Sequence, residues 1–189
     1  MSHWYPALSR LSPGLRRMLH PLQDVLIFFA LLLGFHFLYV WWAEALEYRP
    51  LEPQVLWLFE RVSDMLLRQS LWLLQLLPGV EVLQQGHSIH LAHGEGFVSV
   101  VPECTSLKQW MHWVVIMAFF PGPWKHKLWY IPAGILIIHG VNIFRITGLT
   151  LVQIPFPAHF HFFHDYFFKT LFYLVIFGMW VLWVERFRR

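Results

Sequence analysis

Three residues that together support acyl transfer stand at the ends of apolar segments of this 189-residue chain: Cys104, Arg145 and His164. Cys104 is the only cysteine, so it serves in packing, in metal binding or as a reactive thiol, but not in an internal disulfide. It lies where a polar, strand-like segment (87–101) gives way to an apolar one (107–120). A thiolate can attack a carbonyl, a histidine can move protons, and an arginine can stabilise developing negative charge.

The composition predicts an integral membrane protein of one domain, residues 1–189. Hydrophobic residues make up 57% of the chain and charged residues only 13%, about half the share of a soluble domain. The net charge is +3, but the basic residues form short clusters beside apolar segments, as topology signals do. We therefore expect membrane lipid as a partner and no nucleic acid.

Four segments are predicted to cross the membrane: 25–43, 104–120, 128–150 and 166–185. The first is long enough for a hydrocarbon core of about 30 Å and longer than the roughly 7–15 apolar residues of a signal peptide, so we expect a retained anchor. Residues 54–77 predict an amphipathic helix, because their polar side chains share one arc of the helix. This helix either lies in the membrane interface or spans with its polar stripe turned inward.

The distribution of charge favours the interfacial position for residues 54–77. Of the eleven acidic residues, only Asp24 and Glu185 then fall on the side where the chain starts. Eight of the fourteen basic residues share that side: Arg10, Arg16, Arg17, Lys125, Lys127, Arg186, Arg188 and Arg189. The positive-inside rule then places both termini in the cytoplasm and residues 78–103 outside the inner (cytoplasmic) membrane.

Residues 78–103 contain three short strand-like runs separated by glycines, which predict a β-hairpin or a three-stranded cap. His87, His90 and His93 recur within this segment. That spacing does not keep all three on one face of a strand, so we interpret them as surface histidines and not as a metal site. The expected fold is an all-α, polytopic helical bundle with this small extracytoplasmic β cap.

The segment after Cys104 resembles a helix start, because Ser106 and Gln109 have the spacing of a capping box. A helix that begins near Leu107 places Cys104 by the positive end of the helix dipole, which favours a thiolate. With four spans, Cys104, Arg145 and His164 all lie at the external ends of spans. We expect them to converge there.

Arg145 shares a broad helix face with His139 and Asn142. An arginine within a span costs about 2.5–3.5 kcal/mol on insertion scales, so we expect it to have a partner. An interhelical hydrogen bond without catalytic meaning is the structural alternative. Asp165 could orient His164, cap the last helix or pair with Lys169 four residues on.

These residues resemble the motifs of the exosortase/archaeosortase family of membrane cysteine transpeptidases. Cys104-Thr105-Ser106, Asn142-Ile-Phe-Arg145 and His164-Asp165 stand in the order of the family's cysteine, arginine and histidine motifs. The resemblance covers about residues 80–185. Ser106 replaces the family's usual glycine, and the chain is shorter than eight-span members, which indicates a compact subfamily.

The resemblance implies a sorting enzyme of the cell envelope that acts as a thiol protease or transpeptidase without a metal or other cofactor. Cys104, Arg145 and His164 would be catalytic, with Asn142, Asp165, Thr105 and Ser106 in support. Its substrates would be exported precursors that end in a short motif, a transmembrane helix and a basic tail. The precursor would be cleaved before that helix and passed to an envelope acceptor or to water.

Two interpretations from other classes remain open. One is a metal or haem membrane subunit that uses His159, His161 and His164 with His139. The other is a non-catalytic assembly protein in which Arg145 and Lys169 pair with Asp165 or Glu103.

Overall fold

The computed structural model describes residues 13–92, 96–154 and 156–187, with side chains from residue 22 onward except at Glu103. Four long helices dominate it: α1 (Pro13–Ala45), α2 (Glu52–Gln75), α4 (Trp124–Val152) and the continuous helical run Pro157–Phe187, which contains α5 (Phe160–Phe162) and α6 (Phe168–Leu182). His93, Arg10, Arg188 and Arg189 of the sequence predictions lie outside the described residues. The mostly helical fold with a small sheet confirms the predicted class.

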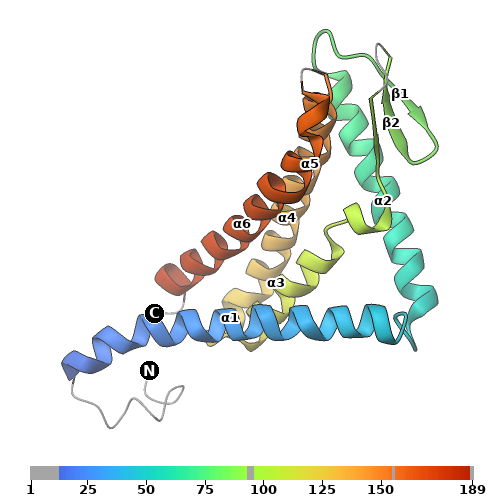
Figure 1. Cartoon of the computed structure of the whole chain (residues 1–189). Helices are drawn as coiled ribbons and strands as arrows, with labels where there is room; N and C mark the ends of the chain where they lie inside the picture. The colour runs from blue at the N-terminus through green and yellow to red at the C-terminus, as the bar shows by residue number, and fades with distance from the viewer. Residues whose placement is uncertain (1–12, 93–95, 155, 188–189) are drawn as a thin grey trace.

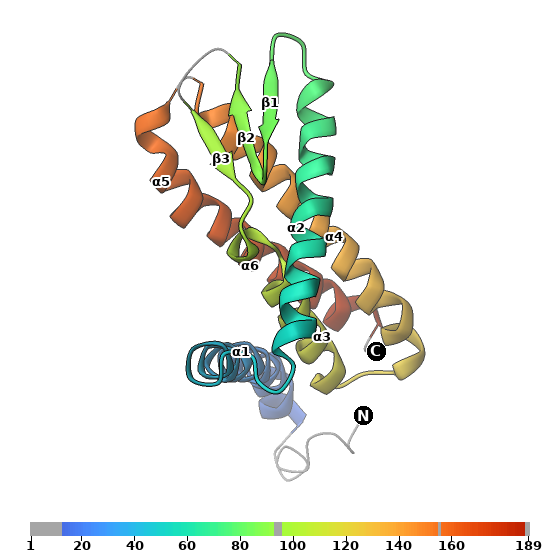
Figure 2. The ribbon, with the colours of Figure 1, turned by 90° about the vertical axis from the view of Figure 1, so that its right-hand side faces the viewer.

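The helices meet around α4 (Figures 1 and 2). α6 runs beside α4, and the short α3 (Leu107–Phe119) packs on the first half of α4. α2 packs on α4 from the other side, and α1 crosses the base of the group. This arrangement leaves the upper half of α4 to support the sheet and the candidate site.

Three helices are long and apolar enough to cross a membrane: Leu22–Ala45, Trp124–Val152 and Pro157–Phe187. The predicted span 104–120 differs, because Pro102–Cys104 forms a 3₁₀ turn and α3 has only 13 residues. At 1.5 Å per residue α3 is about 20 Å long, so its helix alone is shorter than the membrane core. The four-span topology therefore stays a prediction.

The amphipathic helix α2 turns its apolar face inward. Phe59, Leu66 and Leu74 are buried, whereas Arg61 and Arg68 are exposed. His87, in the turn between the first two strands, contacts Asp64 of α2 at 2.9 Å between Nε2 and Oδ1. This contact ties the tip of the sheet to α2.

The β cap is a three-stranded antiparallel sheet in the order β1 (Val82–Gln85), β2 (Ser88–Leu91), β3 (Phe97–Ser99). Ile89 pairs with Val98, and both side chains are buried. Ile89 packs in a cluster with Leu66 and Ile146, whereas Val98 packs with Leu149 and Phe168. The sheet thus rests on α2, α4 and α6, and the prediction of a cap is confirmed.

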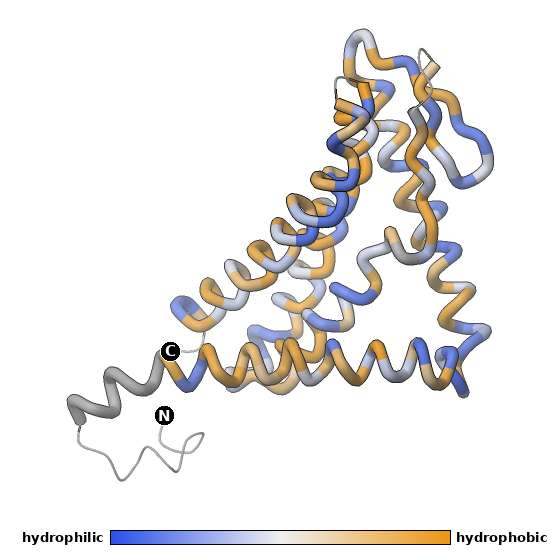
Figure 3. Tube along the Cα trace, in the orientation of Figure 1, coloured by the Kyte–Doolittle hydropathy of each residue, from blue (hydrophilic) through white to orange (hydrophobic). Residues whose placement is uncertain are grey.

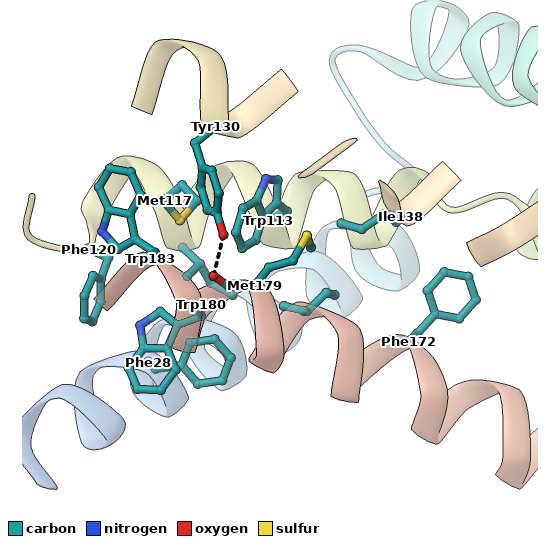
Figure 4. Packing of buried hydrophobic residues seen from close by; sticks show 12 residues of the cluster. Phe28, Trp113, Met117, Phe120, Tyr130, Ile138, Phe172, Met179, Trp180 and Trp183 are labelled. Carbon is teal, nitrogen blue, oxygen red and sulfur yellow. Dashed lines mark hydrogen bonds between the residues drawn. The ribbon is translucent and has the colours of Figure 1, made fainter. Parts of the chain in front are cut away.

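Aromatic side chains fill the core at the other end of the bundle (Figure 4). Tyr130 of α4 donates its hydroxyl to the carbonyl oxygen of Met179 on α6 at 2.7 Å. Trp113 of α3 donates its indole N–H to the carbonyl oxygen of Ile131 at 3.1 Å. These bonds join α3, α4 and α6 within the buried core, so the helices are fixed by polar as well as apolar contacts.

Lys127, which we expected to act as a topology signal, is buried. Its ammonium donates to the carbonyl oxygens of Phe120 (2.6 Å) and Ala118 (3.2 Å) at the end of α3. A cation there satisfies carbonyls that have no partner within the helix and complements the helix dipole.

The close contact of α3 with α4 depends on Gly134, because a Cβ atom there would collide with the indole ring of Trp113. We expect Gly134→Ala to destabilise the protein by about 1–3 kcal/mol, the usual cost of overpacking. Gly140→Ala on the same helix is the control, since a Cβ at Gly140 meets no atom within 4 Å. Thermal unfolding in detergent should show a lower Tm for Gly134→Ala alone, and equal Tm values would contradict this packing.

Candidate active site

Cys104 ends the 3₁₀ turn between the sheet and α3. Its side chain is partly buried, and Sγ lies 3.7 Å from the carbonyl oxygen of Ser99. Thr105 Oγ1 donates to the carbonyl oxygen of Pro102 at 2.7 Å and closes the turn. The cysteine is therefore held just before the N-terminus of α3, where the helix dipole favours negative charge.

The predicted start of α3 is confirmed, but the predicted capping box is wrong. Ser106 is the residue before the helix, yet its side chain makes no capping bond. Both Ser106 Oγ and Gln109 Oε1 are buried and lack a hydrogen-bond partner among the described residues. The first N–H groups of α3 thus have no capping side chain and remain available to an anion.

Asn142 of α4 positions the backbone of the cysteine. Its side chain is fully buried, and Nδ2 donates to the carbonyl oxygen of Cys104 at 2.9 Å. Asn142 lies eighteen residues after Trp124, the first residue of α4, or about 27 Å along the helix. That length is close to the thickness of the hydrocarbon core, so Cys104 and the start of α4 stand about one membrane thickness apart.

Arg145 lies one turn beyond Asn142 and is only 7% exposed. Its Nη2 donates to Nε2 of His164 at 2.9 Å. Its guanidinium also interacts electrostatically with Cys104 and with Asp165. The structure therefore brings together the arginine and histidine that lie nineteen residues apart, with the cysteine within range of the same positive charge.

His164 is held on both sides of its ring. Nδ1 lies 3.0 Å from Oδ1 of Asp165, and the same oxygen accepts a hydrogen bond from Lys169 Nζ at 2.9 Å. A guanidinium only donates, so Nε2 of His164 carries the lone pair and Nδ1 carries the proton in this arrangement. The ring of Phe160 stacks on the imidazole, with centroids 5.7 Å apart.

The backbone around His164 is a π-helical segment, Phe163–Phe167. Such widened turns are rare and occur often at functional sites, because they change the direction in which side chains leave the helix. Here the widened turn contains His164 and Asp165, two neighbours in sequence whose side chains contact each other.

The other histidines of the predictions do not join this group as a metal site. His139 contacts Oε1 of Gln69 on α2 at 2.6 Å, and the exposed His161 lies 3.9 Å from Oδ2 of Asp165. In the described part of the chain, no three His, Cys, Asp or Glu side chains are grouped so that they could hold a metal ion. Lys169 does pair with Asp165, as expected for a non-catalytic assembly protein. The side chain of Glu103, the other acidic partner expected there, lies outside the described residues.

His112 of α3, which the sequence pattern did not predict as a functional residue, is buried and lines a cavity between α1, α3 and α6. The only available signal was a polar residue within an otherwise apolar helix.

Comparison with known families places the chain in one of them. A family model described as transmembrane exosortase matches residues 24–182, a range that contains Cys104, Arg145 and His164. The chain belongs to the transmembrane exosortase family. No curated protein and no solved structure matches it. The match extends from α1 to the end of α6, so the family assignment rests on the whole helical bundle and not on the motifs alone.

Cys104 is the only thiol and is partly exposed, so a single labelling experiment can locate it. We expect a membrane-impermeant maleimide to label it in intact spheroplasts, because the predicted topology places it on the external side. As a control, Lys125→Cys in a Cys104→Ala background should be labelled only after the membrane is breached. The reverse pattern would contradict the orientation.

Proposed function

We propose that this exosortase is a membrane-embedded cysteine protease and transpeptidase for exported precursor proteins. It would cleave a C-terminal sorting signal before the signal's transmembrane helix and transfer the new carboxyl end to an envelope acceptor or to water. The single observation that carries the proposal is the position of Arg145, which donates to His164 and lies one turn from Asn142, the residue that holds the backbone of Cys104. An arginine in this position can orient the histidine that carries protons and can donate to the oxyanion that forms when the thiol attacks.

The first chemical step forms a bond between Cys104 Sγ and the carbonyl carbon of the scissile peptide. The carbonyl oxygen becomes an oxyanion, for which Arg145 and the uncapped N–H groups of α3 are donors. No hydrogen bond joins Cys104 to His164 within the described residues. The attacking sulfur lies just before the N-terminus of α3, where the helix dipole favours negative charge.

His164 carries the proton of the second step. Its Nε2 accepts the proton that the Cys104 thiol releases, and Asp165 stabilises the resulting imidazolium through Nδ1. His164 then gives that proton to the leaving amine as the carbon–nitrogen bond breaks and a thioester to Cys104 forms. An incoming amine or water loses a proton to Nε2, attacks the thioester and releases the thiolate. Arg145 Nη2 must leave Nε2 for these transfers, and the oxyanion offers it a new acceptor.

Removal of the nucleophile tests the covalent mechanism. We expect Cys104→Ala to abolish precursor processing while the protein inserts normally, and Cys104→Ser to be nearly inactive because a hydroxyl is far less acidic than a thiol. Precursor and product are separated by electrophoresis at matched enzyme levels in the membrane. Processing by Cys104→Ala at the wild-type rate would eliminate a thioester intermediate.

Arg145→Lys distinguishes an oxyanion donor from a residue that only supplies charge. Lysine keeps the charge but lacks the planar fork of donors that reaches His164 and an oxyanion in fixed directions. We expect processing to fall at least about a hundredfold, as when one oxyanion donor is lost. Arg68→Lys, at an exposed position of α2, is the control and should process normally. Full activity of Arg145→Lys would make Arg145 a structural residue.

A further inference from the structure

A cavity of about 540 Å³ lies between α1, α3 and α6. Apolar side chains of α1 and α6 form most of its walls, among them Leu33 and Leu174. A second cavity of about 280 Å³ shares Thr170 and Leu174 with the first and continues along the helical run of α6 to Phe162 and Tyr166. α6 and the part of α1 that Figure 3 colours are mostly hydrophobic.

The two cavities together follow the last helix up to the catalytic histidine. Their lining extends from Phe177 to Phe162, about 22 Å of helix. His164 and Asp165 lie within this range, between Phe162 and Tyr166. An extended occupant of both cavities would therefore end at the depth of the candidate active site along this helix, although His164 and Asp165 do not line the cavities.

His112 gives the larger cavity a buried polar acceptor. The side chain is 2% exposed, and Nδ1 lies 2.7 Å from the carbonyl oxygen of Lys108. A carbonyl only accepts, so Nδ1 carries the proton and Nε2 carries a lone pair. That Nε2 is buried and has no hydrogen-bond partner among the described residues. A buried acceptor without a partner favours an occupant that brings a donor.

The depth of His112 distinguishes a lipid from a helix as the occupant. His112 lies eight residues after Cys104, or about 12 Å along the chain of α3. Tyr173, which also lines the cavity, lies nine residues after His164, or about 14 Å along the last helix. That is near the middle of a core of about 30 Å. Acyl chains carry no hydrogen-bond donor at this depth, whereas a helix can present a hydroxyl, amide or indole side chain there.

We propose that these cavities are the docking groove for the apolar helix of the precursor, with a donor side chain of that helix facing Nε2 of His112. The inference rests on the proposed function and adds where and how the substrate is held. A helix seated along α6 would place its external end, and the peptide bond before it, at the depth of Cys104 and His164. Helix contacts at mid-membrane depth would then position a bond that is cut at the membrane surface.

Cysteine cross-linking tests the groove directly. Cys104→Ala removes the only native thiol, so Leu33→Cys or Leu174→Cys then carries a single thiol on the wall of the groove. Each variant is combined with precursors that carry one cysteine at successive positions of the apolar helix and is treated with a copper–phenanthroline oxidant. Leu136→Cys on α4 is the control, because Leu136 is 71% exposed and does not line the groove.

We expect disulfides from both groove positions to precursor positions spaced three and four residues apart, and none from Leu136→Cys. Equal cross-linking from Leu136→Cys, or none from either groove position, overturns the docking site. A phospholipid found in the groove by native mass spectrometry, together with absent groove cross-links, would identify a lipid site instead and also overturn it. The proposed function fails separately, if Cys104→Ala still processes precursor.

His112→Phe tests the hydrogen bond. Phenylalanine keeps a ring beside Phe35, whose centroid lies 4.7 Å from that of His112, but removes the acceptor. In the Leu33→Cys, Cys104→Ala background and at limiting precursor, we expect the cross-linking yield to fall about fivefold, the value of one neutral hydrogen bond. An unchanged yield overturns the role of His112.

Discussion

The buried guanidinium of Arg145 is the constraint on which the rest of this structure depends. It is 7% exposed, and a charge withdrawn from water is tolerated only when partners surround it. His164 accepts from it, and Cys104 and Asp165 interact with its charge. These partners come from the entrance of α3 and from the start of α6, so a shift of either helix along α4 would leave the charge without them.

Two packed regions hold the three helices in register, one on each side of this charge. On one side, Trp113 lies against Gly134, and Tyr130 bonds to Met179, which fixes α3 and α6 on the first half of α4. On the other, Val98 of the sheet packs with Leu149 and Phe168. Asn142 then joins the turn of the cysteine to α4. The polar groups at the site are thus oriented by neighbours that do not themselves react.

Much of the fold could be predicted because it depends on local pattern. Hydropathy predicted four spans, and three of them correspond to the long apolar helices among the described residues. Short runs between glycines predicted a hairpin or three-stranded cap, and the sheet has three strands. The predictions about individual side chains were wrong where tertiary contacts compete with local preferences. Ser106 and Gln109 have the spacing of a capping box, yet both are drawn into the helical packing and make no cap bond. Lys127 belongs to a short basic cluster of the kind that signals topology, but its buried ammonium caps the end of α3.

The sequence by itself determined the residue types of the candidate site, since one cysteine, one arginine in an apolar helix and one histidine beside an aspartate are visible without coordinates. Only the tertiary structure decided that Arg145 donates to His164, that Asn142 donates to the carbonyl of Cys104, and that His112, which has an unpaired nitrogen, lines a cavity. The physical reason is one of range. Helix and strand preferences act over a few residues, whereas these contacts join residues nineteen to thirty-eight positions apart or surround a space between three helices. They exist only once the helices have packed at particular depths along one another.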